Sequence, residues 1–318
     1  MKTTLKWLKR LGLTLLAGAA LFVAYGGIFY GDSDPAFIKE KYGEGLNEVA
    51  LLDATIAYRS AGFDHVDQTP VVMIHSMFFD MSMWDKWSDA LSATRPVYRF
   101  DVAGHGLSSA SKSDDYSLKA TVETLRLFMD DRDLEKVVLV GSSMGAATTL
   151  NFAAEYPERV EKLVLVNAGG LEGHDDADSA GAPSWIYWIL RYMPDWALGS
   201  FVDWVAANND TGDTFREDFK HIFRSVDTRE GILGRMQDFK SPNTRELLPT
   251  LTMPVLIQWG SENPQLPLPQ AHKFKAYIEE GSAPVTLKIY EGAGHLLPAE
   301  PYPQALADLE MFINETAK

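Results

Sequence analysis

Residues 137–152 read VVLVGSSMGAATTLNF. Four branched aliphatic residues run directly into the turn GSSMG, residues 141–145, and an alanine- and threonine-rich stretch of helical character follows. The turn fits the pattern Gly-x-Ser-x-Gly with Ser143 at its centre. Small residues on both sides allow a strand to turn sharply into a helix and lift the central side chain clear of the backbone. The stretch therefore predicts a strand, a tight turn and a helix, with Ser143 exposed at the apex as a nucleophile.

A second role is open to Ser143, because serine commonly caps the N-terminus of a helix. The strand pattern before the turn and the helical pattern after it favour the catalytic interpretation. A helix that begins here also directs its backbone N–H groups towards negative charge developing on a substrate oxygen. Ser142 has no route to the exposed apex, and we do not expect it to act as the nucleophile.

Strand and helix patterns alternate along the chain from residue 50 onward. Several strand candidates are continuous apolar runs, which are typical of strands covered on both faces. The expected strands are residues 50–53, 55–59, 71–75, 97–101, 137–140, 163–167, 255–259 and 285–290. The expected helices are residues 83–93, 118–130, 145–156, 270–278 and 302–313. We therefore expect an α/β fold with a mainly parallel, eight-stranded sheet flanked by helices.

One segment interrupts this alternation. Between about Leu171 and Pro249 the sequence has no clear strand pattern, and four of the eight tryptophans fall within twenty residues: Trp185, Trp188, Trp196 and Trp204. A helical, aromatic insertion is typical of a lid over a sheet. We expect most of these aromatic side chains to bury against the main domain, a few to line a pocket, and residues 172–183 to form a solvated loop.

The expected domain organisation has four parts. They are an N-terminal membrane anchor at residues 1–31, the first part of the α/β core at 32–170, a helical cap at 171–250 and the second part of the core at 251–318.

Composition excludes several classes of function. The chain of 318 residues carries a formal charge of −15, with a pI of about 4.9, so its field repels nucleic acid, and we expect no nucleic-acid partner. Without any cysteine it can form no disulfide framework, thiolate metal site or cysteine nucleophile. It also has no HExxH, no P-loop and no GxGxxG after a strand, so we expect no metal, nucleotide or flavin cofactor.

The first thirty residues predict a signal anchor. Four basic residues precede twenty uncharged residues, Leu11 to Tyr30, and Asp32 and Asp34 follow. As a helix, twenty residues span the ~30 Å hydrocarbon layer of a membrane. The charge distribution orients such a single-pass helix with the catalytic body on the extracytoplasmic, periplasmic side of the cell membrane. Cleavage as a signal peptide after residues 17–19, Ala-Gly-Ala, is the alternative.

A serine hydroxyl needs a base before it can attack a carbonyl. His295 lies in a glycine-rich loop, EGAGHLL, directly after the last expected strand. His75 and His105 also follow strands, where histidine often serves only as a structural hydrogen bonder. Position alone does not decide whether His295 is the general base or a structural hydrogen bonder.

Five stretches together resemble the α/β-hydrolase superfamily, in the branch with a helical cap between strands six and seven. They are VVMIHSMFFDMSMW (71–84), YRFDVAGHGLSS (98–109), VVLVGSSMGAATTLNFAAEYPERVEKLVLVNA (137–168), MPVLIQWGSEN (253–263) and YEGAGHLLPAEPYPQALADLEMFI (290–313). The resemblance implies that Ser143 is the nucleophile and His295 its general base, in the chain order serine, acid, histidine. It also implies an oxyanion hole formed by the backbone N–H groups of Met77 and Met144.

Two positions depart from the superfamily pattern. Ser76 stands where glycine usually follows the histidine after strand three, and Asn263 stands where the pattern WGxxD has its catalytic aspartate. Asparagine can accept a hydrogen bond from the histidine but supplies no negative charge. Asn263 could act as a weaker orienter, Glu262 or another carboxylate could replace it, or hydrolysis could be lost. The alternative acid position after strand six is Asn167, and Glu172 lies further along that loop.

A serine nucleophile argues against relatives that cleave epoxides or halides through aspartate, and favours acyl chemistry. We therefore expect a membrane-anchored serine hydrolase that cleaves a small-molecule carboxylic ester, lactone or related carbonyl compound, with an apolar substrate suggested by the tryptophan-rich cap. A binding or scaffold protein that has kept the fold while its catalytic triad decayed is the alternative.

Overall fold

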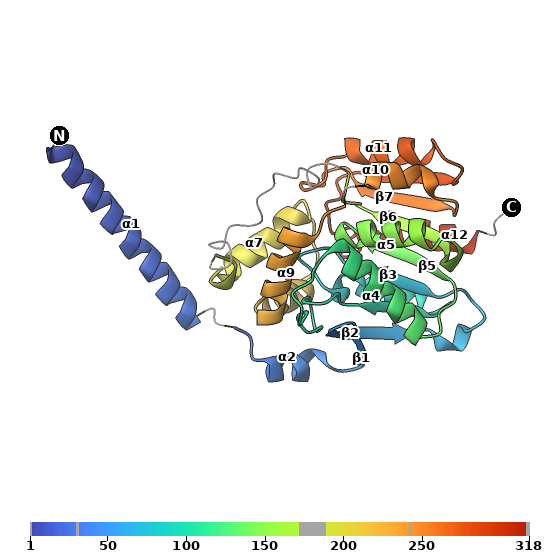
Figure 1. Cartoon of the computed structure of the whole chain (residues 1–318), viewed down its shortest axis with the longest axis horizontal. Helices are drawn as coiled ribbons and strands as arrows, with labels where there is room; N and C mark the ends of the chain where they lie inside the picture. The colour runs from blue at the N-terminus through green and yellow to red at the C-terminus, as the bar shows by residue number, and fades with distance from the viewer. Residues whose placement is uncertain (1, 30–31, 172–188, 242, 316–318) are drawn as a thin grey trace.

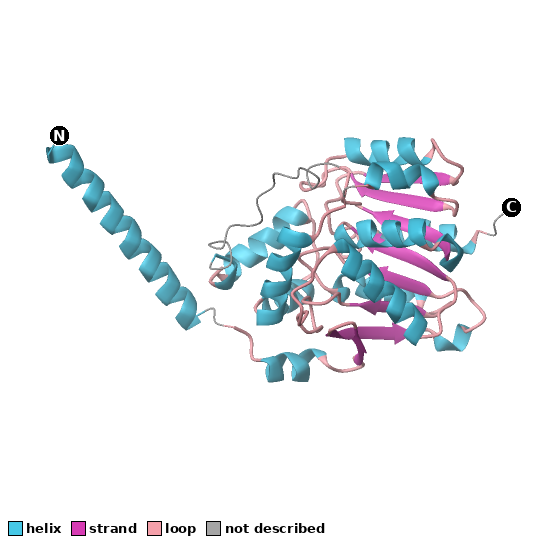
Figure 2. Ribbon diagram, viewed as in Figure 1, coloured by secondary structure: helices cyan, strands magenta, loops and turns pink. Residues whose placement is uncertain are grey.

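A twisted, mainly parallel sheet of eight strands forms the centre of the molecule (Figures 1 and 2). The computed structural model describes residues 2–29, 32–171, 189–241 and 243–315. The strand order is β1-β2-β4-β3-β5-β6-β7-β8; β2 pairs antiparallel with both of its neighbours and the other pairs are parallel. The strands are β1 Asn47–Leu51, β2 Ala54–Ala61, β3 Val71–Ile74, β4 Val97–Phe100, β5 Val137–Ser142, β6 Val160–Val166, β7 Val255–Gly260 and β8 Val285–Tyr290.

The sheet confirms the predicted α/β fold and all eight strands. The first strand lies earlier than the predicted residues 50–53, because Leu52 and Asp53 form the turn into β2. Leu52 has a positive φ of 50°, a conformation that a tight turn requires and a strand does not allow.

Helices cover both faces of the sheet (Figure 2). Five of them correspond to the five predicted helices: α3 Asp85–Leu91, α4 Leu118–Asp131, α5 Met144–Glu155, α11 Pro269–Ile278 and α12 Pro303–Asn314. The predicted helix at 83–93 is split, since residues Met81–Trp84 form a 3₁₀ turn before α3 begins. Further 3₁₀ turns lie at Phe63–His65, Pro157–Arg159 and Leu248–Thr250.

The buried strands send alternate side chains to opposite faces. Val137 and Leu139 belong to one hydrophobic cluster, together with residues of α4, α5 and α11. Val138 and Val140 belong to a second cluster, together with residues of α3, α12 and the helices after β6. Because side chains alternate along a strand, a strand apolar at every position must be covered on both faces. The continuous apolar runs were therefore a sound signal for a doubly covered sheet.

Between β6 and β7 the described residues form helices and loops without a strand. The helices are α7 Asp195–Val205, α8 Asp213–Phe223, α9 Val226–Asp238 and α10 Thr244–Leu247, and we call this segment the cap. Of the four clustered tryptophans, Trp196 and Trp204 lie on α7 and are exposed, whereas Trp185, Trp188 and the predicted loop at 172–183 lie outside the described residues. The two described tryptophans thus do not bury against the main domain as expected.

The connector after the N-terminal helix includes a helix that is absent from the expected helices. It contains helix α2, Pro35–Tyr42, which begins where the Asp34 side chain accepts the N–H of Ala36. Aspartate at the N-cap and proline at the first helical position both favour helix initiation. The connector is also attached to the cap, since Ser33 Oγ donates to the carbonyl of His221 at 2.7 Å.

Helix α1, Lys2–Phe29, extends away from the body of the molecule (Figure 1). Within the part of the chain that the structure describes, no helix combines the length and apolarity needed to cross a membrane. The structure therefore does not support the predicted transmembrane anchor, of which residues 1 and 30–31 lie outside the described residues.

The strand-to-helix turn that presents Ser143 depends on close backbone packing. A Cβ added at Gly145 would overlap the carbonyl oxygen of Ile74, and one at Gly141 would overlap the carbonyl oxygen of Gly145. Glycine at these positions allows α5 to pass directly over the end of β3. The Gly-x-Ser-x-Gly pattern is thus a steric requirement of the crossing.

We expect Gly145→Ala to lower the free energy of unfolding by about 1–3 kcal/mol, because its methyl group must displace the Ile74 carbonyl. Urea unfolding followed by circular dichroism measures the change. Gly199→Ala on α7 is the control, since its added methyl group lies 3.8 Å from the Lys220 side chain and alanine favours a helix. Equal loss in both variants would contradict the steric explanation.

Candidate active site

Ser143 and His295 line the same cavity, which has a volume of about 180 Å³. Met77 and Met144, the residues predicted to form the oxyanion hole, line it as well. The structure therefore brings together four of the five predicted site residues around one space. The remaining lining residues are Ser76, Phe78, Ala147, Gly169, Gly170, Phe239, Ser241, Gln265 and Leu266.

Ser143 occupies the sharp turn between β5 and α5. Its φ of 52° and ψ of −112° are unusual for a residue with a side chain. The turn is held by a hydrogen bond of 3.0 Å from the Ser143 N–H to the Val166 carbonyl on the neighbouring strand. Ser143 is partly exposed, whereas Ser142 is fully buried and its hydroxyl has no hydrogen-bond partner. Of the two serines, only Ser143 opens into the cavity.

His295 is carried by the loop after β8 and is held from several sides. Its backbone N–H donates to the carbonyl of Val205, at the end of α7 in the cap, over 2.8 Å. Asn167 Nδ2 donates to the carbonyls of Gly294 and His295, and its Oδ1 accepts the N–H of Gly260 over 3.0 Å. Asn167 thus joins the ends of β6 and β7 to the histidine loop, and it does not contact the imidazole ring.

Asn263 occupies the acid position and contacts the ring directly. Its Oδ1 lies 3.1 Å from His295 Nδ1 and also accepts the backbone N–H groups of Gln265 and Leu266, each over 3.0 Å. Two backbone donors identify this atom as the oxygen, because an amide nitrogen cannot accept their hydrogens. Nδ1 must therefore carry the proton, which leaves Nε2 unprotonated and able to act as a base. Asn263 supplies the tautomer that a catalytic histidine requires.

No carboxylate among the described residues reaches the His295 ring. Glu262 is exposed and makes only a backbone bond to Ala293, and Glu172 lies outside the described residues. Burial lowers the pKa of His295 to about 3, since nothing compensates for the loss of water around a charged ring. The Asn263 Nδ2 group is buried without a partner. The arrangement orients the base but does not stabilise the imidazolium.

Glu300 lies behind the histidine loop. Its carboxylate accepts the N–H of Gly294 over 2.7 Å and the side-chain amide of Asn209, after α7, over 2.9 Å. Burial raises the pKa of Glu300 to about 7. Glu300 therefore supports the loop and connects it to the cap, while its charge does not contact the imidazole.

The peptide between Ser76 and Met77 is oriented by a histidine. His75 Nε2 accepts the N–H of Val102 over 3.1 Å, so Nδ1 is the donor to the Ser76 carbonyl over 2.8 Å. In a trans peptide the N–H points away from the carbonyl, so this bond directs the Met77 N–H to the opposite side. Among the described residues, no protein acceptor takes the N–H of Met77 or Met144. Both amides are available to an oxyanion.

His105 holds the next peptide along this loop, because its Nε2 is hydrogen-bonded to the Met77 carbonyl. Burial lowers the pKa of both His75 and His105 below the usual range, so both rings are neutral. The serine at position 76 is accommodated: its hydroxyl lies 3.9 Å from the sulfur of Met83. The sequence places both histidines at strand ends, but no local pattern assigns them to the loop after β3 that carries the Met77 N–H, which we call the oxyanion loop.

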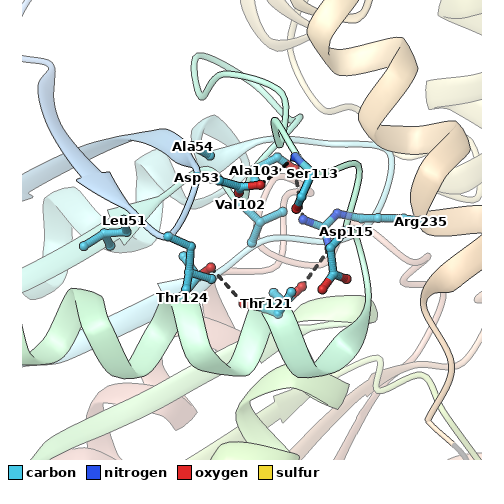
Figure 3. Close-up of a pocket in the computed structure, with 12 residues that line it drawn as sticks. Leu51, Asp53, Ala54, Val102, Ala103, Ser113, Asp115, Thr121, Thr124 and Arg235 are labelled. Carbon is cyan, nitrogen blue, oxygen red and sulfur yellow. Dashed lines mark hydrogen bonds between the residues drawn. The ribbon is translucent and has the colours of Figure 1, made fainter.

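A larger cavity, of about 430 Å³, has a separate lining that includes neither Ser143 nor His295 (Figure 3). Arg235 of α9 reaches into it and donates to Thr121 Oγ1 of α4 and to the carbonyl of Ala103. These bonds attach the cap to the core, and the residues that line this cavity include no histidine. No group of His, Asp and Glu suited to a metal ion occurs within the described ranges.

The geometry is that of a serine hydrolase elbow with a neutral histidine. The α/β hydrolase fold profile matches residues 69–301. The chain belongs to the α/β-hydrolase fold family. It is a hydrolase of the α/β-hydrolase type, as the sequence predicted.

Comparisons with individual proteins agree with this family. An uncharacterized protein of Mycobacterium tuberculosis is 27% identical over 281 residues, which cover 82% of this chain and 78% of that protein. The mouse (lyso)-N-acylphosphatidylethanolamine lipase is 31% identical over 128 residues, or 38% of this chain and 36% of the lipase. The crystal structure of a membrane phospholipase A has a TM-score of 0.69 at 20% identity and covers 99% of this chain and 98% of its own.

The buried, neutral His295 predicts an unusual pH dependence. Because its pKa is lowered to about 3, we expect kcat/KM for a soluble ester to stay level from about pH 8 down to about pH 5. Asn263→Asp places a negative charge beside Nδ1, which favours the imidazolium and raises the pKa of His295. The loss of activity on acidification should then begin at higher pH in the variant. A wild-type midpoint near pH ~6.5 would contradict the lowered pKa.

Proposed function

We propose that the protein is a serine hydrolase of carboxylic esters or lactones that works through an acyl-enzyme. The observation that carries this proposal is the pairing of Asn263 with His295. The side-chain oxygen of Asn263, identified by two backbone donors, holds Nδ1 protonated and leaves Nε2 unprotonated, on a histidine that lines the same cavity as Ser143.

In the proposed reaction, Ser143 Oγ attacks the substrate carbonyl carbon as its proton passes to Nε2 of His295. The N–H groups of Met77 and Met144 stabilise the negative oxygen of the tetrahedral intermediate. The alcohol leaves with the proton from His295. Water then gives a proton to Nε2 as it attacks the acyl carbon. The bond from the acyl carbon to Ser143 Oγ breaks, Oγ takes the proton back from Nε2, and the acid is released.

The cavity favours a neutral, largely apolar acyl group. Methionine, phenylalanine, leucine and alanine side chains make up much of its lining, and the lining residues include no Lys, Arg, Asp or Glu. A charged substituent would lose its water there without gaining an opposite charge. Ser76, Ser241 and Gln265 supply the polar side chains besides the proposed catalytic pair.

Covalent labelling tests the role of Ser143. We expect a fluorophosphonate to label the wild-type chain, and Ser143→Ala to abolish both labelling and turnover of a short-chain p-nitrophenyl ester. Ser142→Ala is the matched control and should keep both, because that hydroxyl is buried away from the cavity. Labelling that persists in Ser143→Ala would overturn the assignment.

Asn263→Asp tests the charge at the acid position. Restoring the carboxylate should raise kcat, by up to about 10²–10⁴-fold, because it stabilises the imidazolium formed as the serine proton is taken.

A second candidate function is a binding or scaffold protein that retains the fold. The observation that favours it is the uncharged acid position, with a buried Asn263 Nδ2 that lacks a partner. This candidate predicts that the wild-type chain neither labels nor turns over ester, and that Asn263→Asp restores both. Labelling of wild-type Ser143 would eliminate it.

We also propose that the N-terminal segment attaches the protein to the cell membrane, with the catalytic body on the extracytoplasmic side. Twenty uncharged residues between a basic and an acidic flank support this proposal. The side chains of Leu13, Leu15, Leu16 and Leu21 on α1 are 66–71% exposed, which also supports it.

Fractionation tests the attachment. The full chain should remain in the membrane pellet after alkaline carbonate extraction, and deletion of residues 1–31 should move it to the supernatant. Mass spectrometry of the mature protein should find the N-terminus uncleaved. A mature start near Ala20 would refute an anchor and favour a signal peptide.

A further inference from the structure

Helix α7 of the cap has an apolar inner face and an aromatic outer face. Trp196 and Trp204 are 74% and 50% exposed, and Ser200 between them is exposed as well. Residues spaced four apart lie on one side of a helix, so these three share a face. Leu198 and Val202 on the opposite side are buried in the core. We call the surface formed by Trp196, Ser200 and Trp204 the outer face of α7.

Helix α7 lies on the side of the body from which α1 extends (Figure 1). The two parts of the chain are in contact, since Gly26 near the end of α1 packs against Tyr192 just before α7, leaving no room for a Cβ. Along its length α1 carries four exposed leucines, so the segment that contacts the cap also has an apolar surface.

Ion pairs attach the segment after α1 to the cap. Asp32 pairs with Arg191 over 2.7 Å and with Arg229 of α9, whose side chain is almost wholly buried. The end of α1 is therefore attached to the cap. A membrane that binds α1 consequently lies within reach of α7.

We propose that the outer face of α7 docks on a lipid surface composed mainly of zwitterionic lipids. Tryptophan suits such a boundary, because its ring is apolar while its N–H can bond to headgroups and water. The formal charge of −15 disfavours an anionic surface. This inference rests on the proposed attachment of α1 to the membrane and adds a second contact to it.

Hydrogen bonds connect the end of α7 directly to the loop that carries His295. The last residue of α7, Val205, accepts the backbone N–H of His295. Four residues later, Asn209 donates to the carbonyl of Gly292 over 2.8 Å and to Glu300. The helix that contacts lipid thus also holds the loop that positions the base. Lipid contact places the cap, and with it the His295 loop, at the surface that contains an apolar ester.

The absence of cysteine makes a site-specific probe possible. In the full chain, Ser200→Cys carries an environment-sensitive fluorophore on the outer face of α7. Leu15→Cys reports on α1. Met311→Cys is the control, because Met311 is 57% exposed and its helix, α12, lies on the side of the body away from α1 (Figure 1). Each labelled chain is reconstituted in phosphatidylcholine vesicles, and quenching by doxyl-labelled phosphatidylcholine is measured.

We expect strong quenching at positions 15 and 200 and none at 311. Replacing Trp196 and Trp204 together by serine should reduce quenching at position 200. It should also slow hydrolysis of a long-chain ester in the vesicles by about tenfold or more, because each lost indole removes apolar area from the contact. Hydrolysis of a short-chain, water-soluble ester should stay unchanged. Vesicles with added phosphatidylglycerol should give no stronger quenching at position 200.

Three outcomes would overturn the inference. Quenching at position 15 without quenching at 200 leaves the attachment of α1 intact and removes α7 from the lipid. Loss of quenching at both positions refutes the attachment as well. A signal at position 200 that follows protein concentration instead of doxyl lipid assigns the outer face of α7 to a second copy of the chain. Fluorophosphonate labelling of Ser143 is independent of all three, so failure here is distinguishable from failure of the proposed hydrolysis.

Discussion

The structure depends on one steric constraint, the close crossing of α5 over the end of β3. Gly145 lies so near the carbonyl of Ile74 that no side chain fits between them. This closeness brings the N-terminus of α5, with Ser143 and the Met144 amide, next to the loop that follows β3. The Met77 amide comes from that loop. The proposed nucleophile and the proposed oxyanion donors therefore meet because two backbones touch. The positive φ of Ser143 follows from the sharp turn that this crossing requires.

In this site one residue orients the His295 ring, but no residue within the described chain supplies the negative charge that would stabilise its imidazolium form. In the serine-protease triad, one carboxylate both holds the histidine tautomer and stabilises the imidazolium. Here Asn263 performs the first task, and its oxygen is fixed by backbone donors of its own loop. The second task has no residue within the described chain, and burial keeps His295 neutral. His75 and His105 are neutral for the same reason and serve as hydrogen-bonding supports of the oxyanion loop. The site is thus preorganised by dipoles and hydrogen bonds, with little help from charge.

The cap is connected to the loop that carries His295 through backbone and side-chain hydrogen bonds. Val205 and Asn209 reach the His295 loop from the end of α7, and the connector after α1 is held by cap residues through Ser33 and Asp32. The N-terminal segment, the cap and the base therefore form one connected structure. A contact made at the cap surface has a short path to the position of His295.

Much of the fold was predictable, because its signals are local. Continuous apolar runs indicated the strands, and the glycines around Ser143 indicated the elbow. The missed helix α2 also had a local signal, since Asp34 and Pro35 form a good N-terminus, but its short length gives too little periodicity to recognise. The exposure of Trp196 and Trp204 was not predictable, because an aromatic residue is apolar whether it packs inwards or faces outwards.

The sequence by itself determined the doubly covered sheet, the elbow at Ser143 and the uncharged side chain at position 263. Periodicity, φ/ψ preference and residue chemistry act within a few residues of each other, so they can be read along the chain. Only the tertiary structure decided that Asn263 Oδ1 faces His295, that His75 and His105 orient the oxyanion loop and that Asn167 ties the histidine loop to two strands. These hydrogen bonds depend on burial and on how the strand ends converge. Asn167 and His295 are 128 residues apart in the chain, and no local pattern encodes which distant donor meets which acceptor.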